Sequence, residues 1–89
     1  MLPDSIPFFA RGMKFRFDET RAAWIVLGPE RVFLPDEHAV AVLRLVDGTR
    51  SMNDIVGTLA AQFDAPHAAI AADVATMFDG LMMKGVIRT

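Results

Sequence analysis

The two histidines are the side chains in this sequence best suited to metal binding or acid–base chemistry. His38 directly follows Asp36 and Glu37, so three possible ligands stand next to one another. Neighbouring residues on a helix point in different directions, and no second histidine follows His38 or His67 four residues later. The sequence therefore predicts no metal site.

A nucleophile is the next requirement for catalysis, and the candidates for a Ser–His–Asp arrangement are Ser5 and Ser51. Ser51 and Asp54 have the spacing of a helix capping box, which explains this serine better. The absence of cysteine excludes a thiolate nucleophile, disulfides and cysteine-ligated metals. Because nothing gathers an acid, a base and an oxyanion donor, we expect the protein not to be an enzyme.

Length and composition favour one small domain with a high hydrophobic content. The chain has 89 residues, 53% of them hydrophobic, which suggests a dense core or an apolar surface reserved for a partner. Charges or turn residues interrupt every apolar run before the roughly 20 residues that a membrane span needs. The first residues lack the cationic start and continuous apolar run of a secretory signal, so we expect a cytoplasmic protein that does not enter a membrane.

Charge is distributed unevenly along the chain. The formal net charge is −2, and the basic residues concentrate between Arg11 and Arg31, whereas the segment from Ser51 to Met83 contains aspartates but no Lys or Arg. A nucleic-acid reader needs cations on the element that enters the groove, because phosphate neutralisation supplies much of its affinity. This distribution argues against a nucleic-acid partner.

Three short segments have the pattern of β-strands. Apolar and polar residues alternate over Met13–Asp18, and two apolar runs, Trp24–Leu27 and Val32–Leu34, flank a turn at Gly28–Arg31. We expect an antiparallel meander of three strands that ends at Pro35. Such a sheet has exposed edges, and exposed edges bind extended peptides.

Three helices should follow the strands. The first is expected from Pro35 to about Val46, the second after the Ser51 cap, and the third from Pro66, with Gly85 at its end. The apolar stripes of the last two helices are Met52, Ile55, Val56, Leu59 and Phe63, then Ile70, Val74, Met77, Phe78 and Leu81. Gly80 inside the third helix suggests close approach of another backbone, and Val86–Ile87 should form a short extended tail.

The order and spacing of residues from Trp24 to Leu81 resemble the PqqD family of pyrroloquinoline quinone (PQQ) biosynthesis. The matching residues are Trp24 with the apolar run to Leu27, Pro29-Glu30, Leu34, Ala39, Leu43, Asp47-Gly48 with Arg50, Ile55-Val56, Leu59-Ala60, Asp73-Val74 and Leu81. Each element alone is common, but their joint order is specific.

The resemblance implies an α+β fold in which a three-stranded antiparallel sheet packs on a three-helix bundle in a winged-helix-like arrangement. Residues 1–12 would form an N-terminal arm and residues 13–89 a single peptide-recognition domain. It also implies a peptide chaperone without a cofactor, which binds the precursor peptide PqqA and presents it to the radical S-adenosylmethionine enzyme PqqE. The alternatives are a winged-helix nucleic-acid binder and a small quinone-binding carrier. We expect Trp24 to anchor the core rather than to stack on a quinone.

The mechanism that we expect is addition of the peptide as a strand to the free sheet edge, with its side chains against the third helix. The candidate peptide-binding residues are Arg31, Val32, Phe33, Leu34, Asp73, Val74, Met77, Phe78 and Leu81. The alternative for the apolar members of the third helix is that they all face the core. An apolar N-terminal arm that could exchange between protomers leaves both a monomer and a swapped dimer open.

Overall fold

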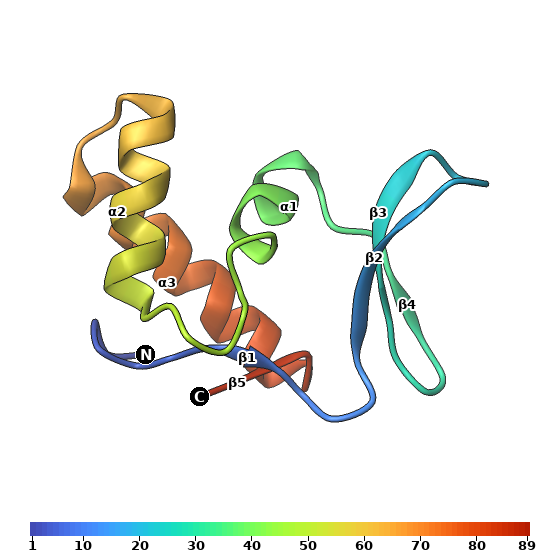
Figure 1. Ribbon diagram of the computed structural model, residues 1–89. Helices are drawn as coiled ribbons and strands as arrows, with labels where there is room; N and C mark the ends of the chain where they lie inside the picture. The colour runs from blue at the N-terminus through green and yellow to red at the C-terminus, as the bar shows by residue number, and fades with distance from the viewer.

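Three helices and two small antiparallel sheets make up the chain (Figure 1). The computed structural model describes every residue from Met1 to Thr89. In chain order the elements are β1 (Phe8–Phe9), β2 (Lys14–Asp18), β3 (Ala23–Leu27), β4 (Val32–Phe33), α1 (Glu37–Leu43), α2 (Met52–Phe63), α3 (His67–Met83) and β5 (Ile87–Arg88). The α+β fold class expected from the sequence is confirmed.

The larger sheet is the expected three-stranded antiparallel meander, in the order β2-β3-β4. Val26 in the central strand pairs with Phe15 on one side and with Phe33 on the other. The third strand was expected to reach Leu34 but ends at Phe33. The next hydrogen-bonded pair after Val26 and Phe33 would need an N–H from Pro35, and proline has none.

Helix α1 begins at Glu37, two residues after the predicted start at Pro35, and it ends earlier than the sequence predicted. The Asp36 carboxylate caps it by accepting a hydrogen bond from the Ala39 N–H at 2.8 Å. After Leu43 the chain tightens, because the N–H of Val46 donates to the Leu43 carbonyl three residues back at 3.1 Å. The segment up to Val46 is therefore a tight turn of the 3₁₀ type and not a continuation of the α-helix.

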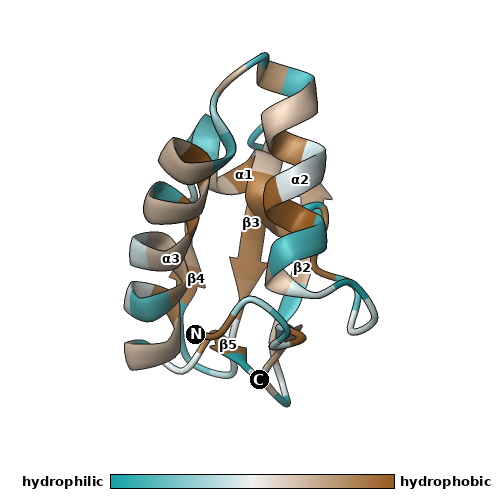
Figure 2. Cartoon of the chain, turned by 90° about the vertical axis from the view of Figure 1, so that its left-hand side faces the viewer, coloured by the Kyte–Doolittle hydropathy of each residue, from teal (hydrophilic) through white to brown (hydrophobic).

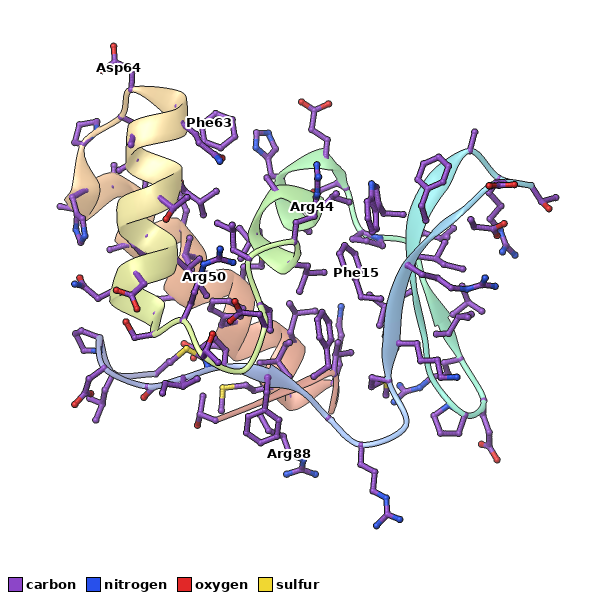
Figure 3. The ribbon with its side chains drawn as sticks, viewed as in Figure 1. Phe15, Arg44, Arg50, Phe63, Asp64 and Arg88 are labelled. Atoms are coloured by element: carbon purple, nitrogen blue, oxygen red, sulfur yellow. The ribbon has the colours of Figure 1, made fainter.

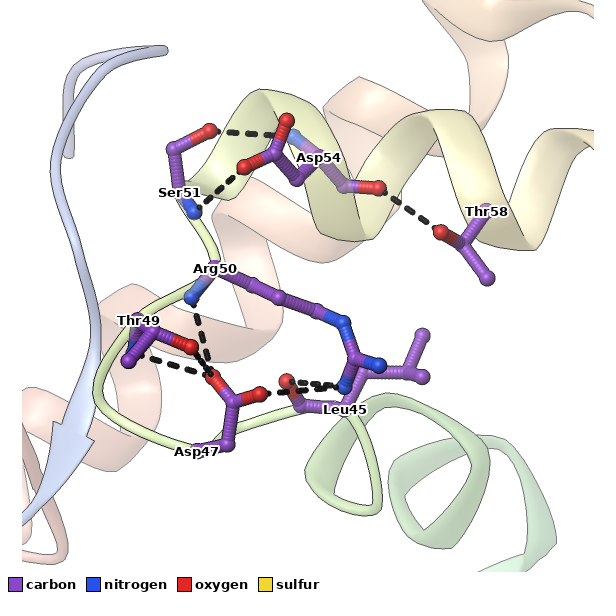
Figure 4. A network of polar contacts seen from close by, with 7 residues as sticks. All are labelled: Leu45, Asp47, Thr49, Arg50, Ser51, Asp54 and Thr58. Atoms are coloured by element: carbon purple, nitrogen blue, oxygen red, sulfur yellow. Dashed lines mark hydrogen bonds and ion pairs between the residues drawn. The ribbon is translucent and has the colours of Figure 1, made fainter.

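Helix α2 starts with the predicted capping box. The Asp54 N–H donates to the Ser51 hydroxyl at 3.1 Å, and the Ser51 N–H donates to the Asp54 carboxylate at 3.0 Å (Figure 4). Helix α3 follows after Asp64, which adopts the left-handed conformation at the end of α2. Pro66 is the N-cap of α3 and not its first helical residue, so this helix begins one residue later than predicted.

The end of α3 confirms the role predicted for Gly85, which has a φ of 76°. Its N–H donates to the Met82 carbonyl at 3.0 Å, and the Val86 N–H donates to the Leu81 carbonyl at 2.9 Å. These two bonds form a Schellman motif, in which a left-handed glycine reverses the chain. The extended tail predicted at Val86–Ile87 is present one residue later, as β5 (Ile87–Arg88), which pairs antiparallel with β1.

The N-terminal residues lie against the rest of the chain through their backbone. The Pro3 and Ser5 carbonyls each accept a hydrogen bond at 2.8 Å, from the N–H groups of Asn53 and Met52 in the first turn of α2. The Ala10 N–H donates to the Val86 carbonyl at 2.9 Å. The first ten residues thus satisfy helix N–H groups that would otherwise lack intrahelical partners.

The buried core lies mainly among the helices. Its members are Val26, Val42, Leu43, Val46, Met52, Ile55, Val56, Leu59, Val74, Phe78, Val86 and Ile87. Figure 2 shows the strand β3 as strongly hydrophobic along its length. None of the helices is both long and apolar enough to cross a membrane.

Trp24 does not belong to this core, contrary to the expectation from the sequence. It is half-buried and stacks on Phe15 with ring centroids 4.8 Å apart, while Phe17 meets it edge-on. The Arg44 guanidinium lies 5.4 Å from the centre of its ring. Its register places Trp24 beside Phe17 near the end of β2, so it belongs to an aromatic cluster on the sheet. Through Arg44, the C-cap of α1, this cluster also contacts the end of that helix.

Candidate peptide-binding groove

Strand β4 is an edge of the sheet, with no partner strand on its outer side. The Gly28 N–H donates to the Arg31 carbonyl at 2.8 Å, which makes these residues the hydrogen-bonded pair that closes the hairpin. Hydrogen-bonded and non-hydrogen-bonded pairs alternate along an antiparallel ladder, so the next pair, Leu27 and Val32, is non-hydrogen-bonded. The N–H and C=O of Val32 consequently point away from β3, toward the free edge.

A groove of about 460 Å³ lies beside this edge, and we call it the β4 groove. Its lining comes from β4 and the segment after it (Val32, Phe33, Leu34, Pro35), from α1 (Ala39, Leu43) and from the end of α3 (Leu81, Lys84). Val32 is 46% exposed and Leu34 is 66% exposed, so part of this apolar lining faces solvent. An unpaired edge beside exposed apolar side chains suits an added strand with apolar residues at alternate positions.

Two cations mark the end of the β4 groove at the end of α3. The Arg31 guanidinium donates to the Lys84 carbonyl at 3.2 Å and lies 5.2 Å from the centre of the Phe33 ring. Lys84 itself lines the groove. The Asp36 carboxylate also lines it, but this carboxylate is engaged in capping α1. The two cations at this end of the groove would attract an acidic side chain.

A second depression of about 470 Å³ opens among the three helices, and we call it the helical cleft. Its lining residues are His38, Ala41, Val42, Leu59, Phe63, Ile70, Asp73, Val74 and Met77. In Figure 3 the Phe63 side chain extends from the end of α2 toward α1. The ring is 58% exposed, which places a large aromatic group at the mouth of an apolar cleft.

The structure divides the predicted site residues between these two places. Val32, Phe33, Leu34 and Leu81 line the β4 groove, and Arg31 lies at its end. Asp73, Val74 and Met77 line the helical cleft instead. Phe78 is fully buried in the core and lines neither depression, so it can act on a ligand only through the residues that it supports.

Sequence reasoning did not identify Lys84 or Phe63 as site residues. Lys84 is the C-cap of α3, and its backbone carbonyl accepts the hydrogen bond from Arg31; the predicted helix end at Gly85 was the available signal for its position. Phe63 was placed in the apolar stripe of α2, where its position at the last residue of the helix was the sign of exposure. Both residues are at helix ends, where a stripe no longer has a packing partner.

The charged side chains form no metal site, and two carboxylates have a lowered pKa. No group of three or more His, Asp or Glu side chains is placed to hold a metal ion. The pKa of Asp47 is lowered to about 2, chiefly because its carboxylate accepts hydrogen bonds from the N–H groups of Arg50 and Thr49. The pKa of Asp18 is lowered by its hydrogen bond from Arg21. Both carboxylates stabilise turns, and neither lines the β4 groove or the helical cleft.

Comparison with known proteins identifies the family. The model of the family described as coenzyme PQQ synthesis protein D (PqqD) matches residues 23–87, which is most of the chain. This chain belongs to the PqqD family. The resemblance read from the residues between Trp24 and Leu81 is thereby confirmed.

Relatives in the PqqD family are similar over most of this chain. A PqqA binding protein of Rhodopseudomonas palustris strain HaA2 is 48% identical over 93% of this chain and 81% of its own length. A bifunctional coenzyme PQQ synthesis protein C/D of Methylorubrum extorquens is 44% identical over 92% of this chain and 22% of its own length.

Two solved PqqD structures have the same fold. One is the solution structure of the PqqD truncation of Methylobacterium extorquens PqqCD, a stand-alone recognition element for ribosomally synthesized and post-translationally modified peptides; it is 40% identical, with a TM-score of 0.77 and full coverage of both chains. The other is PqqD from Xanthomonas campestris, 37% identical with a TM-score of 0.63, covering 100% of this chain and 99% of that one. The R. palustris relative is a PqqA binding protein and the M. extorquens PqqD is a recognition element, so the expectation that the chain is not an enzyme is confirmed.

Proposed function

We propose that this protein binds the precursor peptide PqqA as an added strand on the free edge of β4. The observation that carries the proposal is the backbone of Val32, whose N–H and C=O point away from the sheet beside an apolar groove. The name of the R. palustris relative, PqqA binding protein, supports the choice of peptide.

In this mechanism the backbone and the side chains of the peptide have separate tasks. Main-chain hydrogen bonds to Val32 supply affinity without requiring particular residues. Side chains at alternate positions of the peptide enter the β4 groove against Leu34 and Leu81, which gives selectivity for apolar residues. Arg31 and Lys84 then favour an acidic residue at one end of the bound segment.

We also propose that the bound peptide is presented to the radical S-adenosylmethionine enzyme PqqE. A peptide held along one edge of a small sheet contacts the protein over only a few residues, so the rest of its length stays available to an enzyme. Catalysis would then reside in the partner, which agrees with the lack of an acid–base or metal constellation in this chain.

The decisive substitutions are at Val32. Val32→Pro removes the outward N–H while keeping the β3–β4 hydrogen bonds, because Val32 does not donate to β3. We expect it to weaken the binding of fluorescently labelled PqqA at least tenfold, measured by anisotropy. Val32→Thr keeps the backbone donor and should bind within about twofold of the wild type.

The control for these variants is their thermal unfolding, which must show that both are folded at the assay temperature. Val32 is exposed, so we expect only small changes in stability. Equal binding by folded Val32→Pro and Val32→Thr variants would rule out strand addition at this edge.

A further inference from the structure

Strand addition at β4 leaves the helical cleft without a role. The cleft has a volume of about 470 Å³, and seven of its nine lining residues are hydrophobic. Sites that bind small ligands have volumes in this range and the same combination of apolar walls with a few polar groups. The ring of Phe63 is exposed at the mouth of the cleft, and an exposed aromatic ring beside an apolar cavity is typical of an interaction site.

The cleft and the β4 groove are neighbours along the same two helices. Met77 lines the cleft and Leu81 lines the groove, and these residues are four apart in α3, on one face and about one turn from each other. In α1, Ala39 lines the groove and Ala41 lines the cleft. Residues two apart on a helix face different sides, so α1 lies between the two depressions, and a chain that leaves the groove toward the N-terminal end of α3 reaches the cleft by crossing α1.

The distance between the two depressions is short for an extended peptide. The α3 residues of the cleft centre on Asp73 and Val74, and those of the groove are Leu81 and Lys84. About nine residues of α3 separate the two centres, which corresponds to about 14 Å along the axis of this helix. An extended chain covers this distance in about four residues.

The two depressions differ in their charged groups: two cations lie at the β4 groove, beside the Asp36 carboxylate that caps α1, and one carboxylate lies at the cleft. Lys84 and Arg31 lie at the far end of the β4 groove, whereas the Asp73 carboxylate of the cleft is exposed and takes part in none of the ion pairs of the chain. His38 is the other polar residue of the cleft. A single bound segment would match this arrangement with an acidic residue at one end and a hydrogen-bond donor or base at the other.

We propose that the helical cleft binds a second part of the same peptide, an apolar anchor side chain about four residues from the segment that pairs with β4. This inference rests on the proposed function, because it takes the strand segment as the starting point. The anchor packs against Phe63 and Met77, and its neighbour in the peptide donates to Asp73. The peptide is then held at two places, so the cleft adds selectivity that main-chain pairing lacks.

The test measures binding of synthetic PqqA, at full length and shortened stepwise from each end, to the whole protein. Phe63→Ala should weaken binding of the full-length peptide about tenfold, the usual effect of removing an aromatic anchor contact. Phe63→Leu should keep most of the affinity. The matched control is Phe17→Ala, because Phe17 is also an exposed aromatic but lies outside both depressions.

The shortened peptides separate the cleft from the strand site. Shortening from one end should weaken wild-type binding about tenfold in a single step, and beyond that step the wild type and Phe63→Ala should bind equally. Equal binding of full-length PqqA by the wild type and Phe63→Ala would overturn the role of the cleft. If Val32→Pro still abolished binding in that case, strand addition would stand alone, whereas a wild type that does not bind PqqA would refute both proposals.

Discussion

At the scale of single residues, Asp47 shows how one carboxylate organises the connection between α1 and α2. It accepts hydrogen bonds at 2.9 Å from the N–H groups of Thr49 and Arg50, and from the Thr49 hydroxyl (Figure 4). The Arg50 guanidinium lies 3.3 Å from its other oxygen and donates to the Leu45 carbonyl at 3.4 Å. This turn carries the Asp47-Gly48 and Arg50 residues of the family resemblance, so their role here is structural.

The lowered pKa of Asp47 gives a prediction about pH. Its folded value of about 2 lies below the ordinary 3.8, so its ionised form stabilises the fold above about pH 4, and this contribution is lost as the pH falls toward 2. Asp47→Ala should lower the thermal unfolding midpoint at pH 7. The difference from the wild type should shrink between pH 4 and pH 2, and a difference that stays constant over this range would contradict the assignment.

Residues with local roles could be predicted from the sequence, whereas those with roles in packing could not. Ser51 and Gly85 were identified because caps depend on a few neighbouring residues. Phe78 was placed among the peptide-binding candidates together with Met77, since an apolar helical stripe does not reveal which members face the core. The structure separates the two, with Phe78 in the core and Met77 in the cleft.

At the scale of elements, two glycines near the end of α3 have opposite roles. The sequence suggested a close backbone approach at Gly80, but a Cβ atom there would have no neighbour within 4 Å, so this expectation is wrong. Gly85 also has open space around it, yet its φ of 76° disfavours any residue with a side chain. Conformation, and not space, distinguishes these positions.

A pair of substitutions tests this distinction. Gly80→Ala should stabilise the protein by about 1 kcal/mol, because alanine is the better helix former and nothing obstructs it. Gly85→Ala should destabilise it by about 1–2 kcal/mol, because it forces a left-handed conformation on a residue with a Cβ. Urea unfolding of both variants measures these changes, and the account fails if the two have the same sign.

The elements themselves followed largely from sequence patterns. The meander and the three helices were predicted because alternation and helical spacing are local properties. The errors lie at element ends, where β4 stops before Leu34 and α1 tightens after Leu43. The apolar pattern continues past both ends and does not show them. The strand ends because Pro35 has no N–H to donate, and the α-helix ends because the backbone bonds after Leu43 join residues three apart.

At the scale of the whole molecule, the two ends of the chain are joined. Phe8 and Phe9 pair with Arg88 and Ile87, and Pro3 and Ser5 accept hydrogen bonds from the start of α2. The sequence could not predict this pairing, since the partners stand at opposite ends of the chain and two-residue strands have no periodicity. The same limit applies to the two depressions, which exist only after β4, α1 and α3 come together.

These backbone contacts predict that the N-terminal residues contribute to stability. Deleting residues 1–6 removes the acceptors of the Met52 and Asn53 N–H groups. We expect a loss of about 1–3 kcal/mol in the free energy of unfolding, the usual contribution of two hydrogen bonds. Urea unfolding of the shortened and complete proteins measures it, and an unchanged midpoint would show that the N-terminal segment is bound only weakly.

The most direct test of the account is an NMR titration of isotope-labelled protein with synthetic PqqA. Strand addition predicts saturable shifts of the backbone amide signals of Val32, Phe33 and Leu34, with further shifts at the end of α3 around Leu81 and Lys84. It also predicts slowed hydrogen exchange at the Val32 N–H, because this donor gains a partner. Saturable binding whose shifts lie on another surface, and which leaves Val32–Leu34 unchanged, would contradict peptide binding at the β4 edge.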